Sequence, residues 1–238
     1  QQIVDAALKV LSSKDAAPIT QDLAGKRILI TAGPTHEKID PVRFIANCST
    51  GKLGYTVAKV AASRGADVTL ISGPTHLEAP HGVNVQRVVS AEDMYKACAS
   101  VFDSVDVAIL TAAVADYTPA HPADHKLKKS LEYLESIDLK ETTDILASLS
   151  KAKKEQVVVG FAAETNNVLE HAQAKLERKG CSMIVANDVS RPDSTFGSDT
   201  DRVAFVTPQG VEQFETLPLA DVASELLDRV AKMLEERA

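Results

Sequence analysis

Two spacings of apolar residues alternate along the chain from residue 26 onward. Short continuous runs rich in valine, isoleucine and leucine predict buried strands, whereas apolar residues that recur every three or four positions predict amphipathic helices. The predicted strands occupy residues 28–31, 67–71, 83–88, 106–110, 131–139, 156–161 and 182–186. The predicted helices occupy residues 53–63, 90–101, 143–150, 165–179 and 222–233. This alternation predicts parallel strands connected by helices, which is an α/β, Rossmann-like three-layer sandwich.

The pattern changes at both ends of the chain. Residues 202–207 and 211–216, joined by a Pro-Gln-Gly turn, predict a C-terminal antiparallel hairpin beside a mainly parallel central sheet. Residues 1–25 contain an amphipathic segment, Ile3–Leu11, followed by a polar connection. We therefore expect residues 1–25 to be an N-terminal helix and linker, and residues 26–238 to form one domain.

The ends of the predicted strands indicate where a ligand would bind. In a parallel sheet the carboxyl ends of the strands meet at one edge, and ligands bind beyond that edge. The polar segments that follow the strands are Gly33–Thr35, Gly73–Thr75, Ala112–Asp116, Phe161–Thr165 and Asn187–Asp188. We expect these segments to converge on one crevice. Residues 118–130 show no periodicity and predict a loop.

Composition and charge narrow the class of protein. Apolar residues make up 45% of the 238 residues and charged residues 25%, as is typical of a globular chain. A net charge of −7 argues against nucleic acid or an anionic membrane as the partner, and no apolar run approaches the roughly 20 residues that span a bilayer. The three widely spaced cysteines fit a cytoplasmic protein without disulfides, and the leading glutamine predicts a longer polypeptide upstream.

The segment from Ile28 to Gly54 carries the strongest functional signal. A strand leads through a long polar loop to Ser49-Thr50-Gly51-Lys52, immediately before a predicted helix. Free backbone N–H groups and the helix dipole favour an anion at such a helix start. Ser49 and Gly51 are therefore candidate phosphate-binding residues.

Neither common nucleotide-binding motif fits this segment. A Walker loop needs glycine in place of Ala46, and serine or threonine in place of Leu53. A dinucleotide-binding loop needs glycine in place of Ser49 and should follow its strand closely, whereas a long insertion separates Thr31 from Ser49. An NAD(P)-dependent oxidoreductase is therefore disfavoured.

Several polar residues have both a functional and a purely structural interpretation. Arg43 and Asn47 could contact a phosphate and an acyl oxygen, or they could pair with Asp40 and cap the following helix. Asp116 could contact a ribose, an amino group or Mg²⁺, or it could cap neighbouring N–H groups. Lys126 could close over a polyphosphate, or it could belong to a solvated charged loop.

Two lysines and a cysteine remain open candidates. Lys175 and Lys179 share one helix face, but at about 1.5 Å per residue they lie roughly 15 Å or more from Thr165. A direct contact with phosphate would require the ligand to extend along the helix, or a second subunit; otherwise the lysines are partners of the helix dipole. Cys48 has no histidine near it in sequence, which favours an incidental thiol, and the absence of an H-E-x-x-H pair predicts no zinc site.

A set of segments in the same order resembles the phosphopantothenate–cysteine ligase domain of the bacterial bifunctional coenzyme A biosynthesis protein. These segments are ITAGPTHEKIDPVRFIANCSTGKLG, TAAVADY, KLKK, VVGFAAETNN, IVANDVS and FGSD. In that family an FMN-dependent phosphopantothenoylcysteine decarboxylase precedes the ligase. The resemblance implies CTP-dependent ligation of 4′-phosphopantothenate to L-cysteine through an acyl-cytidylate, with Mg²⁺ assisting and with pyrophosphate and CMP released.

The resemblance also implies roles for individual residues. Asn47 would stabilise the acyl-cytidylate beside Arg43, and Lys126 would act from a flap when the intermediate is converted. Asp116 would contact CTP and Mg²⁺. The other implied CTP contacts are Ala112, Ala113, Lys126, Thr143, Asp144, Ile145, Leu146, Phe161, Lys175 and Lys179. Two positions depart from the family: Thr143 replaces a common proline, and His125 stands where glutamate is frequent.

The family is dimeric, and we expect the hairpin at residues 202–216 to supply interface strands. FMN would be bound only by a fused or associated decarboxylase domain. The competing hypothesis is a non-catalytic nucleotide-binding module that serves as a scaffold for that domain. The joint presence of Arg43, Asn47, Asp116 and Lys126 favours the enzyme, because a scaffold does not need them together.

Overall fold

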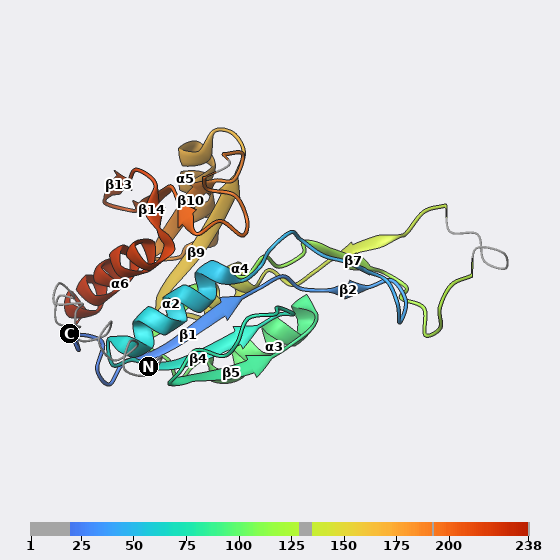
Figure 1. The fold of residues 1–238 in the computed structure, drawn as a ribbon, viewed down its shortest axis with the longest axis horizontal. Helices are drawn as coiled ribbons and strands as arrows, with labels where there is room; N and C mark the ends of the chain where they lie inside the picture. Colours follow the sequence, from blue (N-terminus) through green and yellow to red (C-terminus); the bar gives the residue numbers. More distant parts are fainter. Residues whose placement is uncertain (1–19, 129–134, 192, 238) are drawn as a thin grey trace, which may run out of the picture.

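One eight-stranded sheet forms the centre of the molecule (Figure 1). The computed structural model describes residues 20–128, 135–191 and 193–237, so the helix predicted at Ile3–Leu11 lies outside the described residues. The sheet has the order β13-β12-β10-β9-β6-β1-β4-β5. Its strands are β1 (Arg27–Ala32), β4 (Asp67–Ser72), β5 (Val83–Arg87), β6 (Val107–Leu110), β9 (Val157–Glu164), β10 (Met183–Asp188), β12 (Val203–Thr207) and β13 (Gly210–Gln213).

The direction of the strands confirms the predicted fold class. Across the central sheet, from β5 through β4, β1, β6 and β9 to β10, every neighbouring pair is parallel. By contrast, β12 is antiparallel to β10 and to β13. The predicted C-terminal hairpin is therefore present, with its second strand ending at Gln213 rather than Thr216. β12 is fully incorporated into the central sheet, and β13 forms its edge.

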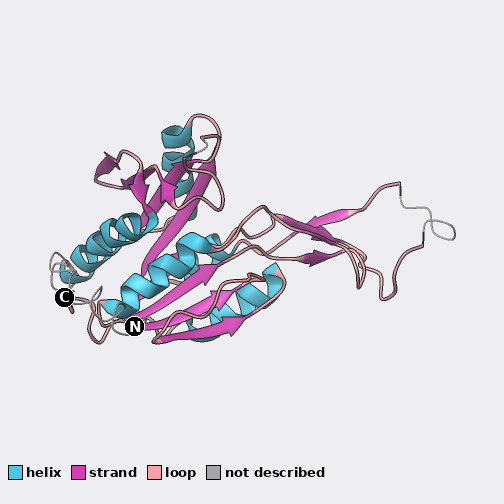
Figure 2. Cartoon of the chain, viewed as in Figure 1, coloured by secondary structure: helices cyan, strands magenta, loops and turns pink. Residues whose placement is uncertain are grey.

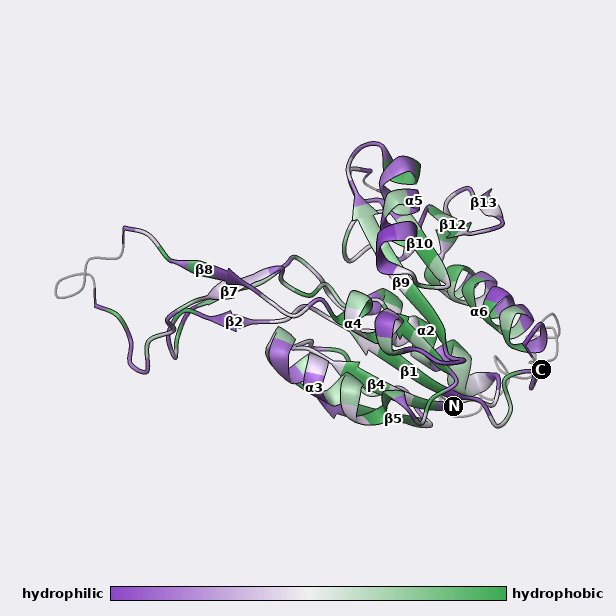
Figure 3. Cartoon of the chain, turned by 180° about the vertical axis from the view of Figure 1, so that it is seen from behind, coloured by the Kyte–Doolittle hydropathy of each residue, from purple (hydrophilic) through white to green (hydrophobic). Residues whose placement is uncertain are grey.

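Helices cover both faces of the sheet, as the three-layer prediction requires. They are α2 (Lys52–Ser63), α3 (Ala91–Phe102), α4 (Ile145–Ala152), α5 (Val168–Lys179) and α6 (Leu219–Glu235). Side chains alternate along a strand, so Ile28 and Ile30 of β1 pack in the cluster formed with α2 and α6. Leu29 packs in the opposite cluster, with α3, α4 and α5. Figure 3 shows the hydrophobic residues concentrated along the central strands.

An arm extends away from the sheet (Figures 1 and 2). It consists of two antiparallel ribbons, one formed by β2 (Glu37–Lys38) with β3 (Phe44–Ile45) and one by β7 (Tyr117–Pro119) with β8 (Leu139–Glu141). We call the described residues 36–45 and 117–141 the arm. Tyr117 and Leu139 are about half exposed. The arm strands therefore lack the buried face that produces an alternation of apolar and polar residues in the sequence.

The arm corrects two of the sequence-based expectations. A strand was predicted at residues 131–139, of which residues 131–134 lie outside the described residues. In the described part, the strand β8 begins only at Leu139 and ends at Glu141. The loop predicted at residues 118–130 includes the end of β7.

Two short strands, β11 (Thr200–Asp201) and β14 (Leu217–Pro218), pair with each other and were not predicted.

The helix α5 begins later than its sequence pattern predicts. Asn167, rather than a residue near Thr165, is its N-cap, and its left-handed backbone has φ 44°. Among the described residues, no helix has the length and apolarity needed to cross a membrane.

Candidate functional site

Two pockets lie beyond the carboxyl ends of the central strands. The large pocket, about 720 Å³, is lined by Asn47 and Cys48, by segments of residues 110–117, 141–146 and 161–164, and by Lys175, Arg178 and Lys179 of α5. The glycine-loop pocket, about 90 Å³, is lined by Ser49–Gly54, Asn187 and segments of residues 194–201. Thr111, Phe161, Ala163 and Phe196 line both. The large pocket has the size of a typical small-molecule site.

The start of α2 forms one wall of the glycine-loop pocket. Gly51 is the N-cap in a left-handed conformation with φ 80°, and no side chain caps the helix. A Cβ on Gly51 would lie 3.0 Å from the Thr75 methyl group and 3.3 Å from the Gly33 Cα atom. The close approach of these three segments therefore favours glycine at position 51 and turns the uncapped helix start toward the pocket.

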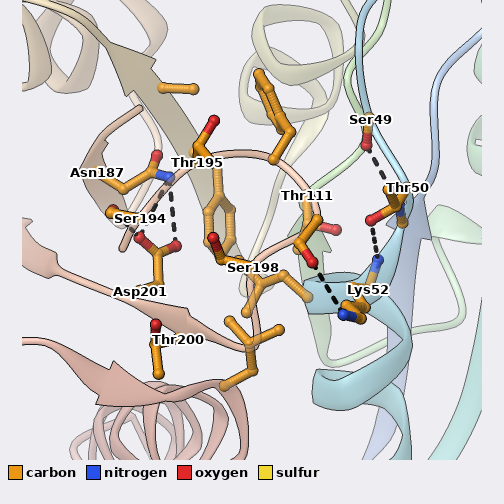
Figure 4. Close-up of a pocket in the computed structure, with 18 residues that line it drawn as sticks. Ser49, Thr50, Lys52, Thr111, Asn187, Ser194, Thr195, Ser198, Thr200 and Asp201 are labelled. Carbon is orange, nitrogen blue, oxygen red and sulfur yellow. Dashed lines mark hydrogen bonds between the residues drawn. The ribbon is translucent and has the colours of Figure 1, made fainter. Parts of the chain in front are cut away.

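A hydrogen-bonded carboxylate forms the opposite wall (Figure 4). The Asn187 amide donates to the Asp201 carboxylate at 3.3 Å, and the Ser194 hydroxyl donates to it as well. Burial raises the pKa of the Asp201 carboxyl above its usual value. Sequence reasoning gave Ser194 and Asp201 no role, because the loop that carries them contacts β10 only in the folded chain.

Lys52 connects the two walls of the glycine-loop pocket. Its ammonium donates to the Gly197 carbonyl at 2.9 Å and forms an ion pair with Asp199 at 2.8 Å. These contacts link the first helical residue of α2 to the loop that carries Phe196. The glycine segment was singled out from the sequence, but this partner of Lys52 could not be deduced from it.

Asn47 lies in the large pocket and is attached to its floor. Its side-chain amide donates to the carbonyls of Ala113 at 3.3 Å and Val114 at 3.0 Å. Because Gly51 is the N-cap of α2, the interpretation of Asn47 as a helix cap is wrong. These bonds fix the amide beside Ala112 and Ala113, which also line the large pocket.

Three of the five predicted strand-end segments reach the pockets, and two support them from behind. Residues 112–116, 161–164 and Asn187 contribute lining side chains. Gly33–Thr35 lies behind residues 112–115, where Ala113 N–H donates to Gly33 and Ala115 N–H donates to the Thr35 hydroxyl. Thr75 packs against Gly33 and Gly51. The predicted crevice is therefore two adjacent pockets.

Cationic side chains from α5 face the large pocket. Lys175 donates to the Phe161 carbonyl at 2.8 Å, and burial lowers the pKa of its ammonium. Lys179 forms an ion pair with Asp144, the N-cap of α4. Burial raises the pKa of the Asp144 carboxyl, but the hydrogen bonds from Lys179 and Ala147 N–H, together with the nearby lysine charges, lower the pKa overall.

These contacts change the expectation for the two lysines. Glu164 at the end of β9 and both lysines line one pocket, so a ligand that extends along α5 can reach them without a second subunit. Lys179 has a carboxylate partner rather than serving only the helix dipole. Thr143, Ile145 and Leu146 line the same pocket around Asp144.

Arg43 and Lys126 lie in the arm and line neither pocket. The predicted pairing of Arg43 with Asp40 is present, with 3.0 Å from Arg43 Nε to the carboxylate. It is not a pair of two exposed groups, because the Asp40 side chain is fully buried. Lys126 is exposed. Their implied catalytic roles stay predictions.

The carboxylates of the large pocket suit a cation bound together with phosphate. Among residues 20–128, 135–191 and 193–237, no three histidine, cysteine, aspartate or glutamate side chains gather into a metal-binding group. Within the same residues, no hydrogen bond to the exposed Asp116 carboxylate is present, so Asp116 does not cap a neighbouring segment. Mg²⁺ is commonly held by one or two carboxylates, water and substrate phosphates, and Asp116 fits that pattern.

The cysteines differ in their surroundings. Cys48 is exposed and lines the large pocket, whereas Cys98 and Cys181 are buried. Burial raises the pKa of Cys98 to about 12 and also raises that of Cys181. The two buried thiols are therefore unreactive core side chains.

Comparison with known proteins places the domain in a family. Residues 23–234 match the family model of the DNA/pantothenate metabolism flavoprotein C-terminal domain. The coenzyme A biosynthesis bifunctional protein CoaBC of Bacillus subtilis is 45% identical over 235 residues, which are 98% of this chain and 57% of that protein. A cysteine/cysteine sulfinic acid decarboxylase from an unknown prokaryotic organism is 39% identical over 237 residues, which are 98% of this chain and 65% of that protein.

A solved structure agrees with this relationship. The crystal structure of the C-terminal domain of a CoaBC protein has a TM-score of 0.79 and 45% sequence identity, and the match covers 91% of this chain and 100% of that chain. The chain spans only 57% and 65% of the length of the two curated relatives. Its sequence, its fold and the extent of the match lead to one conclusion: the chain belongs to the family of DNA/pantothenate metabolism flavoprotein C-terminal domains.

Proposed function

We propose that this domain is a phosphopantothenate–cysteine ligase of coenzyme A biosynthesis that uses CTP and Mg²⁺. The carboxylate of 4′-phosphopantothenate attacks the α-phosphate of CTP, and pyrophosphate leaves. The amine of L-cysteine then attacks the acyl carbon, and CMP leaves. The observation that carries the proposal is the large pocket, where Asn47, Asp116, Lys175 and Lys179 lie around one cavity.

The charges of the large pocket suit a nucleoside triphosphate. Lys175 and Lys179 supply positive charge at one end, and the buried position of Lys175 strengthens its attraction to phosphate. Phe161 offers an aromatic face to the base. Mg²⁺, held beside Asp116, would neutralise charge on the phosphates. The backbone of residues 143–146 supplies further contacts to the nucleotide. Threonine in place of the family's common proline at position 143 leaves the peptide groups that make these contacts in place.

In this proposal Asn47 helps to stabilise the acyl-cytidylate. Its nitrogen is held by the Ala113 and Val114 carbonyls, so the side-chain orientation is fixed before the substrate arrives. Ser49 and Gly51, at the start of α2, supply polar groups for an anionic part of a substrate in the adjacent glycine-loop pocket. Lys126 acts from the arm, and Arg43 acts beside it in the turn that precedes β3.

The proposal includes the wider assembly. The domain works as a homodimer in the cytoplasm. A decarboxylase domain that binds FMN is fused to it or associates with it. The relative named as a decarboxylase is 65% covered by this chain, so its printed activity belongs to a longer protein. We assign no decarboxylation to the cysteines of this chain.

A nucleotide-dependence assay tests the proposal. The chain is incubated with 4′-phosphopantothenate, L-cysteine, Mg²⁺ and one nucleoside triphosphate at a time, and pyrophosphate release is measured. We expect release that requires phosphopantothenate and is fastest with CTP. Release without phosphopantothenate contradicts a ligase, and no release with any nucleotide contradicts a ligase and favours a nucleotide-binding scaffold.

The substitution Asn47→Asp tests the site itself. The introduced carboxylate faces the Ala113 and Val114 carbonyls and repels the anionic intermediate, so kcat should fall by about a hundredfold or more. Asn47 is exposed, so the thermal midpoint Tm should change little. Wild-type turnover in this variant would remove Asn47 from the mechanism.

A further inference from the structure

The turn between β2 and β3 holds the chain segment that carries Lys126. The turn spans Ile39–Arg43 and is closed by Ile39 N–H donating to the Arg43 carbonyl at 2.9 Å. Ala123 N–H donates to the Ile39 carbonyl at 2.9 Å. Both backbone polar groups of Leu127 are hydrogen-bonded: its N–H donates to the Asp40 carboxylate, and its carbonyl accepts from the Arg43 guanidinium, both at 3.2 Å. The backbone of the segment is therefore fixed at two residues, Ala123 and Leu127, which lie on either side of Lys126.

Asp40 is the centre of these contacts. One carboxylate oxygen, Oδ1, accepts from the backbone N–H groups of Val42 and Arg43, both at 2.8 Å. The other oxygen, Oδ2, accepts from Arg43 Nε at 3.0 Å, from Arg43 Nη2 at 2.5 Å and from Leu127 N–H at 3.2 Å. The Arg43 guanidinium lowers the pKa of the Asp40 carboxyl well below its usual range.

This arrangement differs from a surface ion pair. The Asp40 side chain is fully buried although it lies in an arm, and each of its oxygens has a separate task. Oδ1 shapes the turn, whereas Oδ2 joins the Arg43 guanidinium to the backbone of a segment more than eighty residues away. Arg43 Nη2 completes the connection by donating to Leu127.

The turn is itself anchored to the domain. Glu37 of β2 is buried, and its carboxylate accepts from Ala91 N–H at 2.8 Å at the start of α3. β3 leads directly from Arg43 toward Asn47 in the large pocket. Residues 123–127 are therefore attached, through one turn, to elements that border the site.

We propose that Asp40 is a positioning residue for Lys126: its buried carboxylate, shared between Arg43 and Leu127, holds the loop 123–127 against the turn Ile39–Arg43. The consequence for activity rests on the proposed function, in which Lys126 contacts the reacting groups. Arg43 then acts through this contact with the loop, which explains its place outside both pockets. Asp40 does not touch substrate.

The variant Asp40→Asn separates the two tasks of the carboxylate. The side-chain oxygen can still accept from Val42 and Arg43 and keep the turn. The new NH₂ group would then face the Arg43 guanidinium and Leu127 N–H, all of which are donors, so the link to residue 127 is lost. Asp124→Asn is the matched control, because it removes the same charge from the loop 123–127 itself, where the Asp124 side chain contacts only its neighbour His125 in the described residues.

Trypsin cleavage after Lys126 measures the position of the loop without any substrate. Loss of a charge-assisted hydrogen bond should raise the cleavage rate of Asp40→Asn by about tenfold, because cleavage follows the open population. Asp124→Asn should match the wild type. Arg43→Lys is the second variant, in case Asp40→Asn lowers Tm strongly: its ammonium cannot bridge Asp40 and Leu127 as the planar guanidinium does, so cleavage should also accelerate.

A double-mutant cycle with Lys126→Ala tests whether Asp40 acts through Lys126. Asp40→Asn alone should lower kcat by about tenfold and change the KM for CTP less, because the nucleotide contacts that line the large pocket are intact. In the Lys126→Ala background Asp40→Asn should lower kcat no further, since the two changes remove one effect. Multiplicative effects would show a merely structural role and overturn the proposal.

The two proposals fail in different ways. If the wild-type chain shows no pyrophosphate release with any nucleotide, the ligase assignment fails, and the trypsin experiment still decides whether Asp40 holds the loop. If the wild type is active but the cleavage rate of Asp40→Asn equals that of the wild type, the positioning role fails and the ligase assignment stands.

Discussion

Gly54 is the residue at which the start of α2 comes closest to the sheet. A Cβ there would lie 2.4 Å from the Thr111 hydroxyl, 2.6 Å from the Ala32 Cβ and 3.1 Å from the Thr31 carbonyl. Ala32 and Thr31 are parts of a buried strand that cannot move aside. Glycine at this position therefore allows the start of α2, which lines the glycine-loop pocket, to pack closely against the sheet.

We predict that Gly54→Ala is more destabilising than Gly160→Ala. A Cβ on Gly160 would meet the ends of flexible side chains, Leu146 and Ile184, which can adjust. Gly54→Ala should lower the free energy of unfolding by about 1–3 kcal/mol. Urea unfolding of both variants measures the difference, and equal losses would contradict the tighter packing argued for Gly54.

Individual site residues were predictable to different degrees. The roles predicted for Asn47, Lys175 and Lys179 come from the resemblance to a known family, whereas residue spacing alone left these roles open. Asp201 and Lys52 gain meaning only from partners on another loop. Hydrogen bonds between segments distant in sequence leave no periodic signal, so such residues could not be found from one sequence.

At the scale of elements, the central strands were predictable and the arm was not. Strands buried on both faces consist of continuous β-branched and apolar residues, as in Val157–Val159. The arm strands are two or three residues long, and Phe44 and Tyr117 are half exposed, so neither length nor alternation identifies them. Register within the arm comes instead from polar contacts such as those of Asp40.

We predict that Glu37 stabilises the junction of the arm with α3. Its buried carboxylate accepts from Ala91 N–H, beside the capping box that Ser90 and Asp93 form. Glu37→Ala removes this acceptor and the negative charge at a helix start, which should cost about 1–2 kcal/mol of the free energy of unfolding. Lys38→Ala, on the exposed side of the same strand, is the control in urea unfolding. A similar loss in both variants would contradict a specific capping role.

At the scale of the whole molecule, the arm and the C-terminal hairpin are the two candidate surfaces for the proposed homodimer. The hairpin was favoured from sequence, but β12 is buried inside the central sheet and only β13 remains at the edge. The arm exposes apolar side chains, among them Val42 at 59% and Phe44 at 50%. Exposed apolar groups that gather on one extension favour the arm as the interface.

Mass in solution tests this choice. We expect the wild-type chain to be a dimer by light scattering, and Phe44→Asp to lower the mass toward that of a monomer. Val211→Asp on β13 should leave the mass unchanged. The reverse result would return the interface to the hairpin, and a monomeric wild type would exclude both surfaces.

Phe161 and Phe196, which line both pockets, have a consequence for how ligands influence one another. Because Phe161 lines both cavities, a molecule that moved its ring from one side would also change the shape of the other cavity. Thermodynamic linkage then makes the effect mutual: if occupancy of the glycine-loop pocket tightens binding in the large pocket by some factor, the nucleotide tightens the first site by the same factor. Two ligands that each shift one of these shared rings would therefore bind as coupled events.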